Sequence, residues 1–155
     1  KAKLTKGAIY FHFKNKEELI NSLYLDLKKM KIEVLVDAID EKASLQDQIK
    51  SMWTSGVQWG IMHPKEFQFL MQFSNSPFIT HLTKEQAMEG FESTFSFFER
   101  AITEGLIKVV YPELAADYFE GIFNLAISHF RKHPEMISTE NLNVAFDICW
   151  NGIAR

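Results

Sequence analysis

Apolar residues recur every three or four positions along most of the chain, and this spacing constrains the fold more than any other feature. Such spacing places apolar side chains on one face of a helix, where they can pack against another helix. No run alternates apolar and polar residues for long enough to require a strand. The sequence therefore predicts an all-α fold, with helices at about residues 5–13, 15–39, 44–62, 64–73, 83–105, 112–132 and 138–155.

The ends of these helices are marked by residues that cap or interrupt a helix. Asn15, with Glu18 three positions later, has the spacing of a capping box, in which side chains pair with the free backbone N–H groups of the first turn. Pro64 and Pro112 suit the start of a helix, because proline lacks the N–H that would have no partner there. Ser44 and Ser138 are further candidate caps, and Gly105 suits the end of a helix. Along the helix that Asn15 opens, the expected buried stripe is Leu19, Leu23, Leu27 and Met30.

The two ends of the chain differ in charge. Residues 1–31 contain eight lysines against Glu17, Glu18 and Asp26, a net charge of plus 5, whereas residues 32–155 have a net charge of minus 8. A basic segment attracts polyanions such as nucleic acid. Lysines that merely solvate a helix surface would give the same count, so the charge alone leaves both interpretations open.

The remaining composition is that of an ordinary globular protein. Hydrophobic residues make up 46% of the chain and charged residues 24%, which excludes a disordered or collagen-like class. Cys149 is the single cysteine, so no disulfide can form within the chain and nothing indicates an oxidising compartment. No apolar run approaches the roughly 18 residues that a membrane span requires. We therefore expect a cytoplasmic protein with no membrane partner.

Signals for catalysis or metal binding are weak. His129 and His133 share a helical face, but no acidic or cysteine ligand is near them in the sequence. Cys149 lies on an apolar stripe, where a lone thiol is usually inert. No phosphate loop, nucleophile elbow or supported pair of carboxylates is present. We expect neither an enzyme, nor a cofactor, nor a metal site.

Residues 2–19, with the sequence AKLTKGAIYFHFKNKEEL, carry the most specific pattern in the chain. At about 100° per residue, Ile9 and Phe13 face one side of a short helix and would hold it on its scaffold. Lys6 and Tyr10 lie on the flank, where donors meet phosphates at the edge of a DNA groove. The opposite side consists of Gly7, Ala8, Phe11 and His12, and its two small residues, Gly7 and Ala8, permit close approach of DNA.

This pattern resembles the signature of TetR-family transcriptional regulators, in which the second helix of a helix-turn-helix leads directly into a long connecting helix. The positions that match in register are Ala2, Leu4, Thr5, Lys6, Gly7, Ile9, Tyr10, Phe13, Lys16, Glu17 and Leu19. The resemblance implies double-stranded operator DNA as a partner, with phosphate contacts from Thr5, Lys6, Tyr10, His12 and Lys16. It places nearest the bases Gly7, Ala8 and Phe11.

Two further helices precede this segment in the family, and neither is in this chain. We therefore expect the chain to be truncated at its N-terminus, to begin inside the helix-turn-helix, and to bind DNA poorly. The resemblance divides it into two parts. Residues 1–31 would be a remnant of the DNA-binding head with the start of the connecting helix, and residues 32–155 a helical domain for effector binding and dimerisation.

The resemblance also implies a homodimeric repressor that binds a palindromic operator and is released by a small ligand. The many aromatic and methionine side chains indicate that this ligand is apolar or aromatic. Aromatic residues at helical spacing are nevertheless more often part of the core. The candidate ligand-binding residues are Trp53, Trp59, Met62, His63, Phe67, Met71, Phe95 and Phe98. The candidate dimer interface is Tyr118, Ile122, Ala126, Phe130, Phe146, Cys149 and Ile153. The alternative is a helical carrier of small molecules, or a protein-interaction module, that does not bind DNA.

Overall fold

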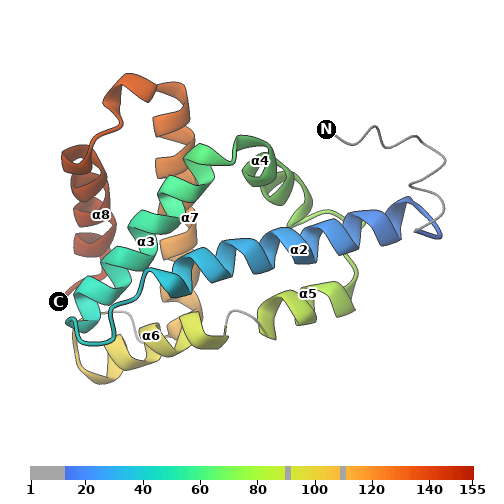
Figure 1. Cartoon of the computed structure of the whole chain (residues 1–155). Coiled ribbons are helices and arrows are strands. Elements are labelled where there is room, and N and C mark those ends of the chain that lie inside the picture. The colour runs from blue at the N-terminus through green and yellow to red at the C-terminus, as the bar shows by residue number, and fades with distance from the viewer. Residues whose placement is uncertain (1–12, 90–91, 109–110) are drawn as a thin grey trace.

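A computed structural model describes residues 13–89, 92–108 and 111–155 of the chain (Figure 1). Within these ranges the only β-type pairing is an isolated bridge between Ile107 and Ala154, so the all-α prediction is confirmed. None of the described helices is both long enough and apolar enough to cross a bilayer. The helical elements are α2 (Lys16–Asp37), α3 (Leu45–Met62), α4 (Pro64–Phe73), α5 (His81–Glu89), α6 (Glu92–Thr103), α7 (Pro112–Lys132), the 3-10 turn η1 (Pro134–Met136) and α8 (Thr139–Ile153).

The start of α2 confirms the predicted cap. The side chain of Asn15 accepts a hydrogen bond from the backbone N–H of Glu18 at 2.8 Å. The carboxylate of Glu18 in turn accepts one from the backbone N–H of Lys14 at 2.6 Å. These bonds satisfy amide groups that the first turn of a helix leaves without partners, so the chain turns into α2 at a defined residue.

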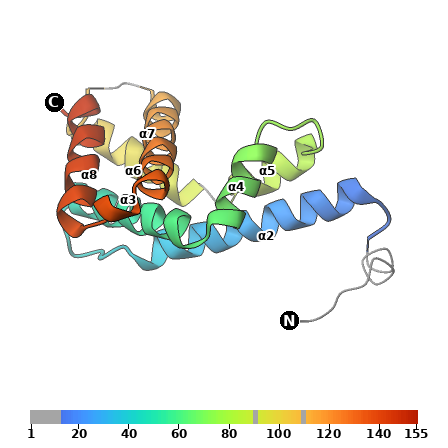
Figure 2. The ribbon, with the colours of Figure 1, turned by 90° about the horizontal axis from the view of Figure 1, so that it is seen from above.

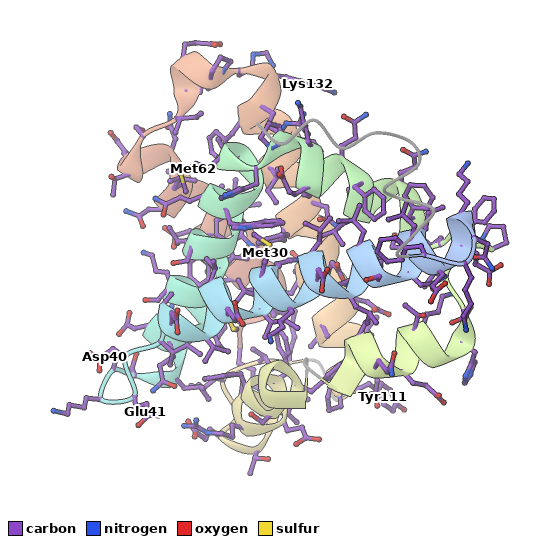
Figure 3. The ribbon with its side chains drawn as sticks, turned by 45° about the vertical axis from the view of Figure 1, so that its right-hand side comes forward. Met30, Asp40, Glu41, Met62, Tyr111 and Lys132 are labelled. Carbon is purple, nitrogen blue, oxygen red and sulfur yellow. The ribbon has the colours of Figure 1, made fainter. Side chains whose placement is uncertain are left out.

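The buried face of α2 differs from the predicted stripe. Leu27 is buried as expected, but Leu23 and Met30 are exposed, and Met30 is labelled in Figure 3. The side chains that pack inward are Ile20, Tyr24, Leu27, Lys31 and Leu35. The predicted stripe was wrong because helical spacing fits two neighbouring faces of α2 equally well, and contacts with α3, α4 and α5 select the second. One member of the selected face is a lysine.

Serine caps and prolines set the other helix starts as predicted. Ser44 accepts a hydrogen bond from the backbone N–H of Asp47 at 3.1 Å at the start of α3, and Ser138 caps α8 in the same way. Pro64 and Pro112 occupy the first turns of α4 and α7. The turn η1 between α7 and α8 was not predicted, because three residues carry no periodic signal.

The single helix predicted from about residue 83 to residue 105 is two helices. α5 packs against α2, whereas α6 packs against α7 and α3, and Figure 2 shows α5 and α6 along different directions. One straight helix could not reach both sets of partners, so tertiary packing overrides the continuous apolar spacing. Residues 90 and 91, between the two helices, lie outside the described residues. Gly105 has a φ of 71°, a left-handed conformation that suits glycine, and it ends the α6 segment as predicted.

Helix α3 runs through the middle of the fold and contacts α2, α4, α6, α7 and α8. Figures 1 and 2 show α6, α7 and α8 around it, while α4 and α5 lie along the N-terminal part of α2. The largest fully buried side chains come from α3, α6, α7, α8 and the segment after α6, and they are Trp53, Phe98, Phe146, Ile49, Ile107, Ile127, Val57 and Cys149. This core fixes α3, α7 and α8 as one scaffold against which α2 lies.

The crossing of α2, α3 and α7 is closely packed at Gly56, and this gives a first prediction. A β-carbon at Gly56 would lie 2.6 Å from both Leu35 Cδ2 and Phe123 Cε2. We expect Gly56→Val to lower the free energy of unfolding by about 1 to 3 kcal/mol through overpacking, as measured by urea denaturation. Gly121→Ala is the matched control. Nothing lies within 4 Å of its added carbon, so it should stabilise α7 by about 0.5 to 1 kcal/mol. Equal effects of the two changes would show that the crossing is not tight.

Candidate functional site

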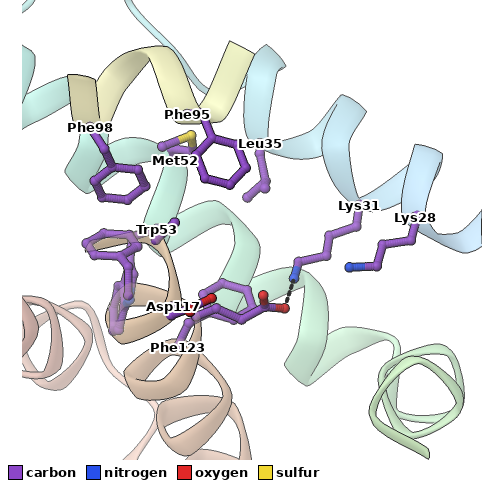
Figure 4. Close-up of a pocket in the computed structure, with 12 residues that line it drawn as sticks. Lys28, Lys31, Leu35, Met52, Trp53, Phe95, Phe98, Asp117 and Phe123 are labelled. Atoms are coloured by element: carbon purple, nitrogen blue, oxygen red, sulfur yellow. Dashed lines mark ion pairs between the residues drawn. The ribbon is translucent and has the colours of Figure 1, made fainter. Parts of the chain in front are cut away.

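A cavity of about 150 Å³ lies between α2, α3, α6 and α7 (Figure 4). One of its ends is apolar and aromatic, whereas the other has two lysines from α2 and two carboxylates from α7. A space of this size has room for about one benzene-sized ring. The residues that line it are Lys28, Lys31, Leu35, Met52, Trp53, Phe95, Phe98, Ala116, Asp117, Phe119, Glu120 and Phe123.

Lys31 is the buried charge of this cavity. Its side chain is 10% exposed, and its Nζ lies 3.8 Å from Oε1 of Glu120 and 4.5 Å from the centroid of the Phe123 ring (Figure 4). The distance to Glu120 is that of an ion pair and is longer than a hydrogen bond. Burial lowers the pKa of Lys31 to about 8, against the opposing effect of Glu120 and with a further lowering from Lys28. Lys31 therefore carries a buried positive charge that the contacts with Glu120 and Phe123 balance only in part.

Lys28 lies one helical turn before Lys31, and Figure 4 shows the two side chains extending from α2 in the same direction. Burial lowers the pKa of Lys28, and Glu120 partly offsets the effect. Asp117 and Glu120 are likewise three residues apart on α7, and both are exposed. The positive side of the cavity is thus more deeply buried than the negative side.

The indole of Trp53 forms part of the apolar wall. Its ring packs edge-on against Phe146 of the core, with the centroids 5.8 Å apart. Its Nε1 is the one buried side-chain polar atom among the described residues that has no hydrogen-bond partner. A buried N–H without an acceptor is unfavourable, so the indole is buried at some cost to the stability of the fold.

Three of the predicted ligand-binding residues, Trp53, Phe95 and Phe98, line this cavity. The other five lie elsewhere, at the end of α3 and on α4. Trp59 stacks on His63 with centroids 5.2 Å apart, and Phe67 is part of the core. Met62 and Met71 are exposed, and Figure 3 labels Met62. Six residues of helix separate Trp53 from Trp59, about 9 Å along the axis, so the two side chains serve different parts of the fold.

Sequence reasoning missed the charged residues of the cavity, which are Lys28, Lys31, Asp117 and Glu120. A signal for Lys31 was present. It lies four residues after Leu27 and four before Leu35, so it occupies an apolar position of the helical pattern. A lysine at such a position is rare unless its charge is paired or used.

Most of the predicted DNA-contact residues, Thr5, Lys6, Gly7, Ala8, Tyr10, Phe11 and His12, lie outside the described residues. Lys16 is described. It is the first residue of α2, is exposed, and holds its Nζ 5.7 Å from the centroid of the Phe78 ring. The segment predicted to contact DNA therefore leads directly into α2, the helix that lines the cavity about four turns further on.

The N-terminal half of α2 is fastened to the connection between α4 and α5. The side-chain amide of Asn21 donates to the carbonyl of Phe78 at 2.8 Å, and its oxygen accepts from the backbone N–H of Thr80 at 3.1 Å. Both partners are nearly 60 positions away in the sequence. A movement of α4 or α5 is therefore transmitted to this end of α2.

The outer surface of α7 and α8 is apolar. Leu125 is 63% exposed and Ile148 is 65% exposed, and they line a shallow groove with Val144 and Met136. Of the predicted interface residues, Ile122, Ala126 and Phe130 line the same groove. Tyr118 is half-buried, and three side chains pack inside the chain itself, namely Phe146, Cys149 and Ile153. Burial raises the pKa of the Cys149 thiol to about 12, so this thiol stays protonated.

Comparison with known proteins finds a sequence match at the N-terminus and similar folds among solved structures. Residues 1–23 match the family described as bacterial regulatory proteins of the tetR family. The fold is similar to that of a protein assigned as a TetR-family transcription regulator from Shewanella sp. PV-4, with a TM-score of 0.87 and 22% identity over 98% of this chain and 82% of that one. It is equally similar, with a TM-score of 0.87, to a TetR-family transcription regulator from Marinobacter aquaeolei VT8, at 17% identity over 97% and 79% of the two chains.

At these identities the structural likeness shows a shared fold, and the family's sequence pattern comes from the N-terminal segment. The N-terminal segment thus has the family's sequence pattern, and the described helices have the same fold as the two solved TetR-family regulators.

Proposed function

We propose that the protein is a homodimeric repressor that binds a palindromic operator in the cytoplasm and is released when a small ligand enters the cavity. One observation carries this proposal. The segment that matches the family extends into the first turns of helix α2, and further along this helix lines the cavity with Lys28, Lys31 and Leu35. A ligand that favours one position of α2 over another therefore changes the position of the DNA-binding end.

The two predicted parts of the chain meet within this helix. We propose that residues 1–31 serve DNA binding and residues 32–155 serve effector binding and dimerisation, with α2 belonging to both. The pair of hydrogen bonds from Asn21 to the α4–α5 connection supports this division. It gives the DNA-binding end a second attachment to the helical body, so that the two ends of α2 move as one unit.

The apolar surface on α7 and α8 supports dimerisation. Contiguous exposed apolar surface usually marks an interface, and a two-fold axis through two helices per protomer forms a four-helix contact. The exposed residues that would make this contact are Leu125, Met136, Val144 and Ile148.

We expect Ile148→Asp, alone or with Leu125→Asp, to convert the dimer to monomer, because each buries a charge against the same surface of the second copy. Light scattering after size-exclusion chromatography measures the mass directly. Met71→Asp is the control, since Met71 is an exposed apolar residue on α4, a helix that contributes no residue to this groove. An unchanged mass for the double variant would place the interface elsewhere.

Footprinting on the DNA upstream of the protein's own gene tests the proposed function. The protein expressed from its complete reading frame should protect two inverted half-sites whose centres are about one or more helical turns apart. A ligand that fills the cavity should remove this protection. Absence of any protected site would favour the alternative, a helical carrier of small molecules.

A further inference from the structure

The charges of the cavity differ in depth, and this difference selects the sign of a ligand. The side chain of Lys31 is 10% exposed, whereas that of Glu120 is 54% exposed. Asp117 is also exposed. Carboxylates at the surface can turn into water at little cost, whereas the side chain of Lys31 is almost completely buried.

The pairing of Lys31 in this structure is weak for a buried cation. Its nearest carboxylate oxygen is 3.8 Å away, and the Phe123 ring supplies the other contact. An ammonium group donates up to three hydrogen bonds, and a carboxylate placed at 2.7 to 2.9 Å satisfies it better than Glu120 does at its present distance. An anion arriving in the cavity therefore gains a stronger contact than the one that it displaces.

The apolar end of the cavity determines which chemical group the uncharged part of the ligand must have. Phe95, Phe98 and Phe119 leave room for about one ring, and Phe98 and Phe119 are themselves packed edge to face at 5.4 Å. A ligand that fits has a ring at this end and an anionic group toward Lys31.

We propose that the effector is a small aromatic carboxylic acid, bound as its anion with the carboxylate on Lys31 and the ring among Trp53, Phe95 and Phe98. This inference rests on the proposed function, in which the cavity is the effector site. A cationic ligand is disfavoured, because its charge would lie beside both Lys28 and Lys31. A neutral apolar ligand would leave the Lys31 ammonium as poorly paired as it is now.

Isothermal titration of the full chain with benzoate, benzamide and benzylamine tests the proposal. These probes share one ring and differ in the charge of the substituent. Benzoate should bind, and benzamide should bind about ten- to hundredfold more weakly, because its neutral carbonyl replaces the charged carboxylate as the acceptor for Lys31. Benzylamine should not bind. Equal affinity for benzoate and benzamide, preference for benzylamine, or binding of none of the three would each overturn the proposal.

Variants separate pairing at Lys31 from general effects of charge. Lys31→Met should weaken benzoate about ten- to hundredfold, whereas Lys29→Met, at an exposed position on the same helix, should leave the affinity unchanged. Glu120→Gln should strengthen benzoate binding severalfold, because it removes the carboxylate that competes for Lys31. Weaker binding in Glu120→Gln would contradict the displacement step. None of these titrations contains DNA, so failure of the operator footprint and failure of the acid site give separate results.

Discussion

Lys31→Met is expected to raise the free energy of unfolding by about 1 to 3 kcal/mol, although it removes an ion pair. Methionine has nearly the same shape as the lysine stem and fills the same space beside Phe123. It also removes the free energy needed to bury an ammonium whose carboxylate partner is 3.8 Å away. Replacement of a buried, imperfectly paired ion by an apolar residue is often stabilising by this amount.

Urea denaturation of Lys31→Met, with Lys29→Met as control, measures this effect. The control should change stability by no more than about 0.5 kcal/mol, because Lys29 is exposed. A clear loss of stability in Lys31→Met would mean that the contacts with Glu120 and Phe123 outweigh the burial of the charge. Residues with this profile, unfavourable for the fold and located in a cavity, are the ones that we expect to serve a ligand.

The stabilisation by Lys31→Met should depend on pH in a defined direction. Burial lowers the pKa of Lys31 from 10.5 in the unfolded chain to about 8 in the folded one. Between these values the unfolded chain binds more protons, so the free energy of unfolding of the natural chain rises as pH rises through this window. The advantage of Lys31→Met should therefore be largest below about pH 8 and small above about pH 10. An advantage independent of pH would show that the charge of Lys31 is not its source, since Cys149 titrates alike in both chains.

Lys6→Ala and Tyr10→Ala should each weaken operator binding about ten- to hundredfold in the protein from the complete reading frame. The family resemblance places both side chains at DNA phosphates, and a charge-assisted hydrogen bond to a phosphate has this magnitude. Lys6→Ala should also make the slope of log affinity against log salt concentration shallower by about one, because one phosphate contact is lost. Tyr10→Ala should leave this slope unchanged. Electrophoretic mobility shifts over a salt series measure both quantities.

Lys29→Ala is the control for these two variants, because it removes a positive charge from an exposed position on α2. Its effect should be small at salt concentrations where charges are screened beyond about 10 Å. Full retention of binding by both Lys6→Ala and Tyr10→Ala would refute the assigned contact face of the helix-turn-helix.

Local signals predicted the element boundaries well, because they depend on a few neighbouring residues. Asn15, Ser44 and Ser138 each cap the helix that follows, and Pro64 and Pro112 each lie in a first turn. Each of these signals satisfies a backbone group within four residues, so tertiary contacts are not needed to define it.

The predictions that depended on tertiary packing were less successful. The stripe on α2 was placed one face away, since Leu23 and Met30 have the same spacing as the residues that are buried. The break between α5 and α6 follows from contacts with different partners, which periodicity does not contain. The residues suggested for the interface follow the inward stripe of α8, where Phe146 and Cys149 pack inside the chain.

The cavity could be anticipated only in its aromatic part. Trp53, Phe95 and Phe98 come from two helices separated by about 40 residues, and only the folded chain shows that they share one wall with Lys31. Lysine was treated as a surface residue because most lysines are. The available signal was the position of Lys31, four residues from both Leu27 and Leu35, where the helical pattern calls for an apolar residue. A search for charged residues at such positions applies to other long amphipathic helices as well.

A titration of operator DNA at two salt concentrations tests the central claim most directly. The protein from the complete reading frame is titrated against the DNA upstream of its own gene at about 50 mM and about 200 mM salt. Tight binding by the complete protein that weakens about a thousandfold or more at the higher salt would support a regulator that grips several phosphates. No binding at either salt would contradict the account and leave the ligand carrier as the better interpretation.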